Sequence, residues 1–178
     1  MKEYFFKMRG GARRPPGVGW REILWSWIGS FLGIGVAGFL NGRLIEPGDL
    51  TLLIGSFGAS AVLIYGAVKS PLAQPRNLIG GHLLSAIVGV TAYKMMGGTW
   101  FACGFAVSFA IAAMLLTETL HPPGGATALI AVIGSEKIHN LGYLYVFVPT
   151  LAGVLVLLMT ALLVNNLAGE RRYPEYWF

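Results

Sequence analysis

The stretch Glu118-Thr119-Leu120-His121-Pro122-Pro123-Gly124-Gly125-Ala126-Thr127 interrupts a long apolar region and decides how that region can fold. Proline has no backbone N–H and cannot continue the helix before it, but it suits the first turn of a new helix. We therefore predict a helix that ends near Thr117, an irregular link through His121, and a second helix that begins at Pro122 or Pro123. Irregular backbone within a membrane is tolerated only where protein buries it or where it lines a wet cavity. The stretch is therefore the first candidate for a functional site.

The composition indicates an integral membrane protein. Of the 178 residues, 55% are hydrophobic and only 12% are charged, whereas soluble domains carry about 25% charged residues. The 25 glycines are typical of helices that pack closely in lipid. The net charge of +5 comes mainly from the two ends of the chain, so it indicates membrane topology and not a nucleic-acid partner.

The apolar pattern predicts an all-α, polytopic membrane helix bundle. Residues 1–22 are basic and aromatic and are expected to lie at the cytoplasmic surface, and residues 169–178 form a short aromatic tail. A single transmembrane domain is expected over residues 23–168. Its six segments cover about 23–41, 50–68, 78–96, 99–117, 122–135 and 143–167.

The fifth segment is too short to cross a membrane as one helix. Its fourteen residues would give a helix of about 21 Å, and a hydrocarbon core is about 30 Å thick. Either the His121 link enters the membrane or the fifth segment is re-entrant. If the second segment were re-entrant as well, four full spans would remain. The nineteen uncharged residues of the second segment favour six spans.

The basic residues favour a cytoplasmic N-terminus. In the six-span arrangement, ten of the 13 Lys and Arg residues lie on the side of the N-terminus, which obeys the positive-inside rule. We expect a location in a bacterial plasma membrane. The charge distribution does not separate six spans from four, because the same side remains the more basic one in both.

A weak internal repeat suggests an inverted architecture. The stretch Gly58-Ala59-Ser60-Ala61-Val62-Leu63-Ile64 resembles Gly125-Ala126-Thr127-Ala128-Leu129-Ile130-Ala131 at an offset of 67 residues. Two units, 23–96 and 99–167, would hold three segments each, and an odd number inverts the second unit. Inverted repeats are common in transporters, where broken helices meet at the binding site.

The two Gly-Ala-Ser/Thr stretches are candidates for an anion site. Each would open a half-helix with unpaired N–H groups and a positive dipole end, which suits a small anion. Ser60 and Thr127 would add hydroxyl donors, with Gly58, Ala59 and Gly124–Ala126 around them. Close helix packing with local hydroxyl bonding explains the same residues equally well.

His121 is the strongest single candidate for a functional residue, because ionisable residues within membranes are costly to keep. It is expected to donate to an anion or to titrate, or else to hold the helix break together. Glu118 precedes it by three residues and is expected to support His121, to couple a proton or to reach the surface. Glu-x-x-His also occurs as a metal pair in bundles, but the chain has only eight acidic residues. We expect no metal or other cofactor and no enzyme activity.

A second stretch, Ser70-Pro71-Leu72-Ala73-Gln74-Pro75-Arg76-Asn77, is followed by Gly80-Gly81-His82. Its prolines predict an extended loop. Gln74, Arg76 and Asn77 provide donors, and Arg suits a planar oxyanion. Alternatively, Arg76 is a positive-inside anchor and Asn77 caps the third segment. His82 should lie on the same membrane side as His121.

The His121–Ala128 run and the Ser70–His82 stretch together resemble the signature motifs of the HPP family of integral membrane proteins, over roughly residues 20–168. The family is usually described with four spans, so the predicted six depart from it at the second and fifth segments. Chloroplast and cyanobacterial members are associated with nitrite transport, and most bacterial members have no assigned substrate. The resemblance implies a transporter more firmly than it implies nitrite.

The leading hypothesis is a transporter or channel for a small oxyanion, nitrite by resemblance, held at the half-helix ends. The alternatives are a non-transporting membrane scaffold or sensor subunit and, less favoured, an intramembrane enzyme. The glycine-rich faces suggest a homo-oligomer, dimer or trimer.

Overall fold

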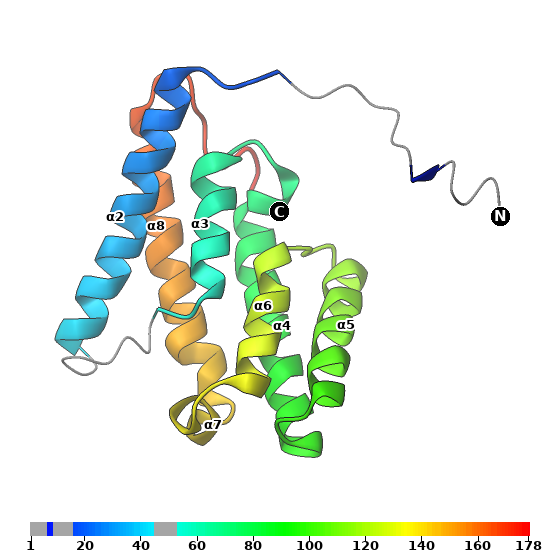
Figure 1. Cartoon of the computed structure of the whole chain (residues 1–178). Coiled ribbons are helices and arrows are strands. Elements are labelled where there is room, and N and C mark those ends of the chain that lie inside the picture. Colours follow the sequence, from blue (N-terminus) through cyan, green and yellow to red (C-terminus); the bar gives the residue numbers. More distant parts are fainter. Residues whose placement is uncertain (1–6, 9–15, 45–52) are drawn as a thin grey trace.

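The computed structural model describes residues 7–8, 16–44 and 53–178. Within these ranges the chain forms helices and no strand, which confirms the all-α helix bundle (Figure 1). The elements are α2 (Trp20–Leu44), α3 (Ser56–Gly66), the 3-10 turn η1 (Pro71–Ala73), α4 (Pro75–Met96), α5 (Trp100–Leu116), α6 (Pro122–Ile133), α7 (Glu136–Leu141), the π-type turn η2 (Val146–Leu151) and α8 (Ala152–Leu167).

Three of the described helical segments, namely α2, α4 and Val146–Leu167, are long and apolar enough to cross a membrane, and the third is kinked at Val148, whose backbone is extended. The apolar helices α3, α5 and α6 are shorter. Helices α3 and α6 have 11 and 12 residues, which correspond to about 16–18 Å against a hydrocarbon core of about 30 Å. The predicted shortness of the fifth segment is therefore confirmed, and the helix of the second segment is short as well.

The boundaries of the second segment differ from the expected nineteen-residue span. Its helix begins at Ser56 and ends at Gly66, so residues 53–55 and 67–68 of the apolar run are not helical. Residues 50–52 lie outside the described ranges. An uninterrupted apolar run gives no signal for where a helix starts, because apolar side chains fit buried loops equally well. The second and fifth segments thus both rest on short helices flanked by non-helical backbone.

Local sequence signals explain the helix ends. Thr99 caps α5, where its side chain accepts a hydrogen bond from the Ala102 N–H at 3.1 Å. Helix α4 starts with Pro75 and ends before Gly97, which has a φ of 66°, a left-handed conformation that favours glycine. Helix α6 starts with Pro122, and the preceding residue is extended, as proline requires.

The helices pack in two groups, and each group takes helices from both halves of the chain. Helices α2 and α3 pack with α8, and α5 and α6 pack with α4. Helix α3 also packs against α6, which joins the groups, and Figure 1 shows these two short helices side by side at the centre of the bundle. An inverted repeat over 23–96 and 99–167 predicts this kind of exchange. The repeat itself stays a prediction.

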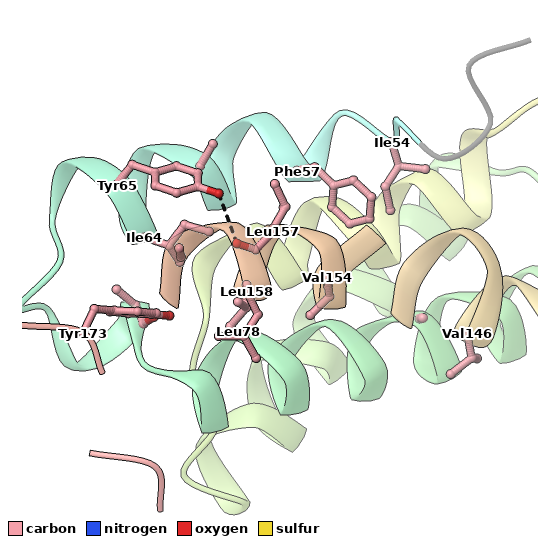
Figure 2. Close-up of a cluster of buried hydrophobic side chains, with 14 of the residues drawn as sticks. Ile54, Phe57, Ile64, Tyr65, Leu78, Val146, Val154, Leu157, Leu158 and Tyr173 are labelled. Atoms are coloured by element: carbon pink, nitrogen blue, oxygen red, sulfur yellow. Dashed lines mark hydrogen bonds between the residues drawn. The ribbon is translucent and has the colours of Figure 1, made fainter. Parts of the chain in front are cut away.

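A core of large side chains holds α3, α8 and α4 together (Figure 2). Phe57, Ile64 and Tyr65 are fully buried there with Leu157 and Leu78. The Tyr65 hydroxyl donates a hydrogen bond to the Leu157 carbonyl at 3.0 Å. The α4–α5–α6 side is instead packed by small residues, with Ala102, Ala106 and Ala110 at four-residue spacing. Small residues at such spacing let helix backbones approach closely.

The C-terminal tail is tied to the start of α2 at one end of the bundle. Arg171 is buried and binds Glu22 near the start of α2, with 2.8 Å between Arg171 Nη2 and Glu22 Oε1. It also donates to Ser26 and Asn165. Arg171 therefore joins α2, α8 and the tail.

The C-terminal tail, expected as a short aromatic segment, packs partly into the bundle. Tyr173 is buried and donates to the Ala73 carbonyl at 2.7 Å, and this burial raises the pKa of its hydroxyl. Most of the basic segment expected over 1–22 lies outside the described residues, and α2 begins at Trp20.

Candidate functional site: a buried histidine network

The predicted break between α5 and α6 is present. Helix α5 ends at Leu116, His121 is extended, and α6 begins at Pro122. Glu118 takes a left-handed conformation with a φ of 56°, and the Thr119 N–H returns to the Met114 carbonyl at 2.8 Å. The link thus turns back on α5 and points His121 into the bundle, where the side chain is fully buried.

The first turn of α6 offers fewer backbone donors than a half-helix site would need. Pro122 and Pro123 have no N–H, and the Gly124 N–H already donates to the His121 carbonyl at 2.8 Å. The expected cradle of unpaired N–H groups is therefore largely missing at this helix. The donors that remain available near the break are side chains.

Those side chains form one continuous hydrogen-bonded network. Ser60 Oγ lies 2.7 Å from His82 Nε2 and 2.9 Å from His121 Nε2. The other ring nitrogen of His82, Nδ1, lies 2.7 Å from Thr127 Oγ1. Thr127 Oγ1 in turn lies 2.8 Å from Ser56 Oγ. The network therefore runs from Ser56 through Thr127, His82 and Ser60 to His121.

The backbone anchors the network at its His121 end. His121 Nδ1 lies 2.7 Å from the Leu72 carbonyl oxygen. A carbonyl can only accept, so His121 Nδ1 carries a hydrogen and donates it. This bond fixes the ring orientation and leaves Nε2 facing Ser60.

All five side chains of the network are fully buried. They come from four segments: α3, α4, the α5–α6 link and α6. The two imidazole rings are 5.0 Å apart between centroids, and the Phe57 ring meets His82 edge-on at 5.7 Å. Because the polar groups satisfy one another, the site is closed around its own side chains in this structure.

Close approach of α4 and α6 brings the network together. A Cβ atom on Gly81 would lie 2.5 Å from His121 Cβ, and one on Gly124 would lie 2.8 Å from the Gly81 carbonyl oxygen. Glycine at these two positions is what allows His121 to reach Ser60. Of the motif residues around them, Pro123 is buried, Gly125 and Ala126 are partly buried, and Pro122 is exposed.

The other predicted site residues take different roles. Gly58 and Ala59 lie on the exposed side of α3, away from the network. Gln74 is buried and binds the Val68 and Ser70 carbonyls, and its own carbonyl accepts from the Glu175 N–H. Asn77 donates to the Leu120 carbonyl at 2.9 Å. Gln74 and Asn77 therefore hold loops in place and are not free donors in this structure.

Glu118 does not contact His121. It lies at the surface, 3.4 Å from Arg76 Nη2, and Arg76 also donates to the Thr117 carbonyl at 2.9 Å. Glu118 and His121 do not share a helical face, because the chain has already left α5 at Thr117. Arg76 therefore clamps the start of α4 to the link that carries His121.

Two members of the site were missed from the sequence. Ser56 lies four residues before Ser60, on the same face of α3, so helical spacing could have found it. Tyr145 donates to the Thr127 carbonyl at 3.1 Å from a distant segment, and no local pattern signals this contact. Among the described residues, no three His, Cys, Asp or Glu side chains converge as a metal site would require.

A family model of the HPP transmembrane region matches residues 15–174, nearly the whole chain. The chain belongs to the HPP family. Two transmembrane proteins of Dictyostelium discoideum are each 49% identical to it over 99% of its length. The chain spans 58% and 64% of those relatives, and no solved structure matches it.

The family and the apolar helices establish a membrane protein. The expectation of a bacterial plasma membrane gains no support, because both relatives come from a eukaryote. The cytoplasmic N-terminus stays a prediction from the charge distribution.

Proposed function

We propose that this HPP protein transports a small inorganic oxyanion across a membrane, with nitrite as the candidate that the family resemblance suggests. The observation that carries the proposal is the network of Ser56, Ser60, His82, His121 and Thr127 in the centre of the bundle. Buried polar groups within a membrane are costly and usually mark a substrate or proton pathway.

The network provides donors that suit an oxyanion. A bent anion with two oxygens needs two or more donors that can turn toward it. Ser60 and Thr127 have rotatable hydroxyls, and each lies between partners that it can leave. The described form is then the closed one, in which the side chains bind one another. An entering anion takes the place of their mutual hydrogen bonds.

The charges favour entry from the end of the bundle at which α4 and α6 begin. Lys69 and Arg172 line a cavity of about 360 Å³ there, together with Glu170 and the Arg171–Glu22 ion pair. Arg76 adds a partly exposed cation beside the His121 link. Clustered cations raise the local anion concentration and so speed capture.

The proposal also covers the oligomeric state of the protein and its orientation in the membrane. The protein works as a homo-oligomer in a lipid bilayer with its N-terminus in the cytoplasm, and it is not an enzyme. The glycine-rich helices support oligomerisation, and the excess of basic residues on one side supports the orientation.

A non-transporting scaffold or sensor subunit is the second candidate, and one specific observation favours it. Every polar side chain of the network has a partner, as in a bundle whose polar centre serves only to specify packing. This candidate predicts no flux of any anion.

The deciding experiment is uptake into vesicles that contain the purified protein, compared with empty vesicles. Nitrite, nitrate, formate and chloride should be tested in parallel. Saturable, protein-dependent uptake of at least one oxyanion is expected. Absence of uptake for all four would favour the scaffold.

A further inference from the structure

The hydrogen-bond pattern of the network constrains its proton content. Ser60 has one hydroxyl hydrogen and lies between two ring nitrogens, His82 Nε2 and His121 Nε2. It can donate to only one of them and must accept from the other. The two rings are therefore never equivalent. Since His121 Nδ1 donates to Leu72, a neutral His121 receives the Ser60 hydrogen, and His82 Nε2 then donates to Ser60.

The number of hydrogens on His82 depends on the direction in which the Thr127 hydroxyl donates. When Thr127 donates to Ser56 at 2.8 Å, or to the Pro123 carbonyl at 3.3 Å, the hydrogen between Thr127 and His82 must come from His82 Nδ1. His82 then carries hydrogens on both nitrogens and is a cation. When the Thr127 hydroxyl turns to His82 Nδ1, Ser56 supplies the hydrogen in return, and His82 is neutral. Both patterns satisfy every bond, and they differ by one proton.

The network does not favour a second proton. The ring centroids are 5.0 Å apart, and two imidazolium cations at that distance in a buried site would repel strongly. The groups that face the rings are Ser56, Ser60, Thr127, the Phe57 ring and the Leu72 carbonyl, none of them charged. Tyr145 adds one titratable hydroxyl, which it donates to the Thr127 carbonyl.

We propose that the His82–Ser60–His121 bridge carries one proton with each anion, so that the protein is an electroneutral proton–anion symporter. The inference rests on the proposed function. A proton from the aqueous phase binds the lone pair of His82 Nδ1 as Thr127 turns away, and it leaves to water on the other side. Ser60 can relay the charge between the rings. In this relay the His82 Nε2 proton passes to Ser60 Oγ as the Ser60 hydroxyl proton passes to His121 Nε2, and no other covalent bond is made or broken.

Burial provides the coupling between the two ions. An imidazolium alone in the centre of the bundle, or an anion alone there, lacks a countercharge and is costly. Together they form a neutral pair at the same place. Each ion therefore stabilises the binding of the other, and such coupling is reciprocal.

The test measures anion uptake and internal pH together in vesicles with a set membrane potential. Empty vesicles correct for undissociated nitrous acid, which crosses lipid by itself, and nitrate serves as a second substrate. We expect about one proton per anion, uptake accelerated by an inward proton gradient, and no dependence on the membrane potential. Uptake that follows the potential and moves no proton would overturn the symport and leave the transporter intact. Absence of uptake of any anion would overturn both.

Two histidine variants test whether His82 carries the proton. His82→Gln keeps an amide donor and acceptor at the ring position but cannot carry the proton, so proton movement should fall at least 10-fold. His139→Gln is the matched control, because His139 stacks on Tyr93 at 3.7 Å outside the network. It should transport like wild type. Coupled proton movement retained in His82→Gln would contradict the proposal, and the voltage test on the wild type decides the matter if that variant does not fold.

Discussion

At the scale of single residues, the arrangement depends on which ring nitrogens carry hydrogens. The Leu72 carbonyl accepts from His121 Nδ1 at 2.7 Å, and the single Ser60 hydrogen separates the two Nε2 atoms. One buried ring is thereby set as the acceptor from Ser60 and the other as the donor to it. This asymmetry is what allows the pair to hold one proton.

The two rings should therefore have opposite tautomers in the neutral state. We predict the Nδ1–H form for His121 and the Nε2–H form for His82. Nitrogen NMR of histidine-labelled protein can measure this, because the chain has only three histidines and His139→Gln assigns the third. The same tautomer in both rings would contradict the predicted hydrogen-bond directions.

The variant Thr127→Val tests whether a side-chain hydroxyl of the network binds the anion. Thr127→Val removes the hydroxyl that joins His82 to Ser56 and keeps the shape of the side chain. We expect anion affinity to fall about 10-fold, which corresponds to roughly 1.4 kcal/mol for a lost hydrogen bond. Thr160→Val is the control, since the Thr160 hydroxyl donates to the Val156 carbonyl of its own helix and lies outside the network. Equal affinities in the two variants would reduce Thr127 to a packing role.

At the scale of helices, α4 and α6 approach each other closely at Gly89. A Cβ atom there would lie 2.5 Å from the Ala128 carbonyl oxygen and 2.8 Å from Ala128 Cα. Backbone atoms cannot yield as a flexible side chain can. The glycines of α4 therefore determine whether Ser60, His82 and His121 meet.

Gly89→Ala should destabilise the fold by about 1–3 kcal/mol, the usual cost of overpacking. A lower thermal unfolding temperature in detergent would show this. Gly104→Ala on α5 is the matched control, because a Cβ atom there meets nothing within 4 Å, and helix propensity alone should make it neutral or slightly stabilising. If the two variants unfolded at the same temperature, the described α4–α6 contact would be wrong.

The helix break at His121 could be predicted because proline chemistry acts locally, and the structure places α6 at Pro122 as expected. Other features depend on distant contacts. Gln74 binds the tail through the Glu175 N–H, and Asn77 binds the Leu120 carbonyl, so neither role follows from its neighbours in sequence. The prediction of free N–H groups at the start of α6 is wrong. The local sequence already argues against it, because Pro122 and Pro123 have no N–H.

At the scale of the whole molecule, the buried cation Arg171 holds α2 to α8. Arg171 binds both carboxylate oxygens of Glu22, at 2.8 and 2.9 Å, and also reaches Asn165 in α8. Among the described elements, α2 packs extensively only against α3 and α8. The Arg171 contacts therefore contribute to seating α2 at that end of the bundle.

Arg171→Gln should lower stability by about 2 kcal/mol, less than the loss of a fully buried ion pair because Glu22 is partly exposed and can be solvated. Thermal unfolding in detergent would measure the loss. Arg172→Gln changes the same charge at an exposed neighbour and should have no effect. Equal unfolding temperatures for Arg171→Gln and the wild type would show that the tail does not anchor α2.

The central claim is that the buried network is the transport site, and uptake of nitrite by the His121→Ala protein tests it most directly. His121→Ala removes the anchor to Leu72 and the partner of Ser60, and His139→Ala removes a histidine outside the network. We predict saturable uptake in the wild type and in His139→Ala, and uptake at the level of empty vesicles in His121→Ala, with all three proteins inserted equally. Wild-type uptake by a correctly inserted His121→Ala protein would contradict the account.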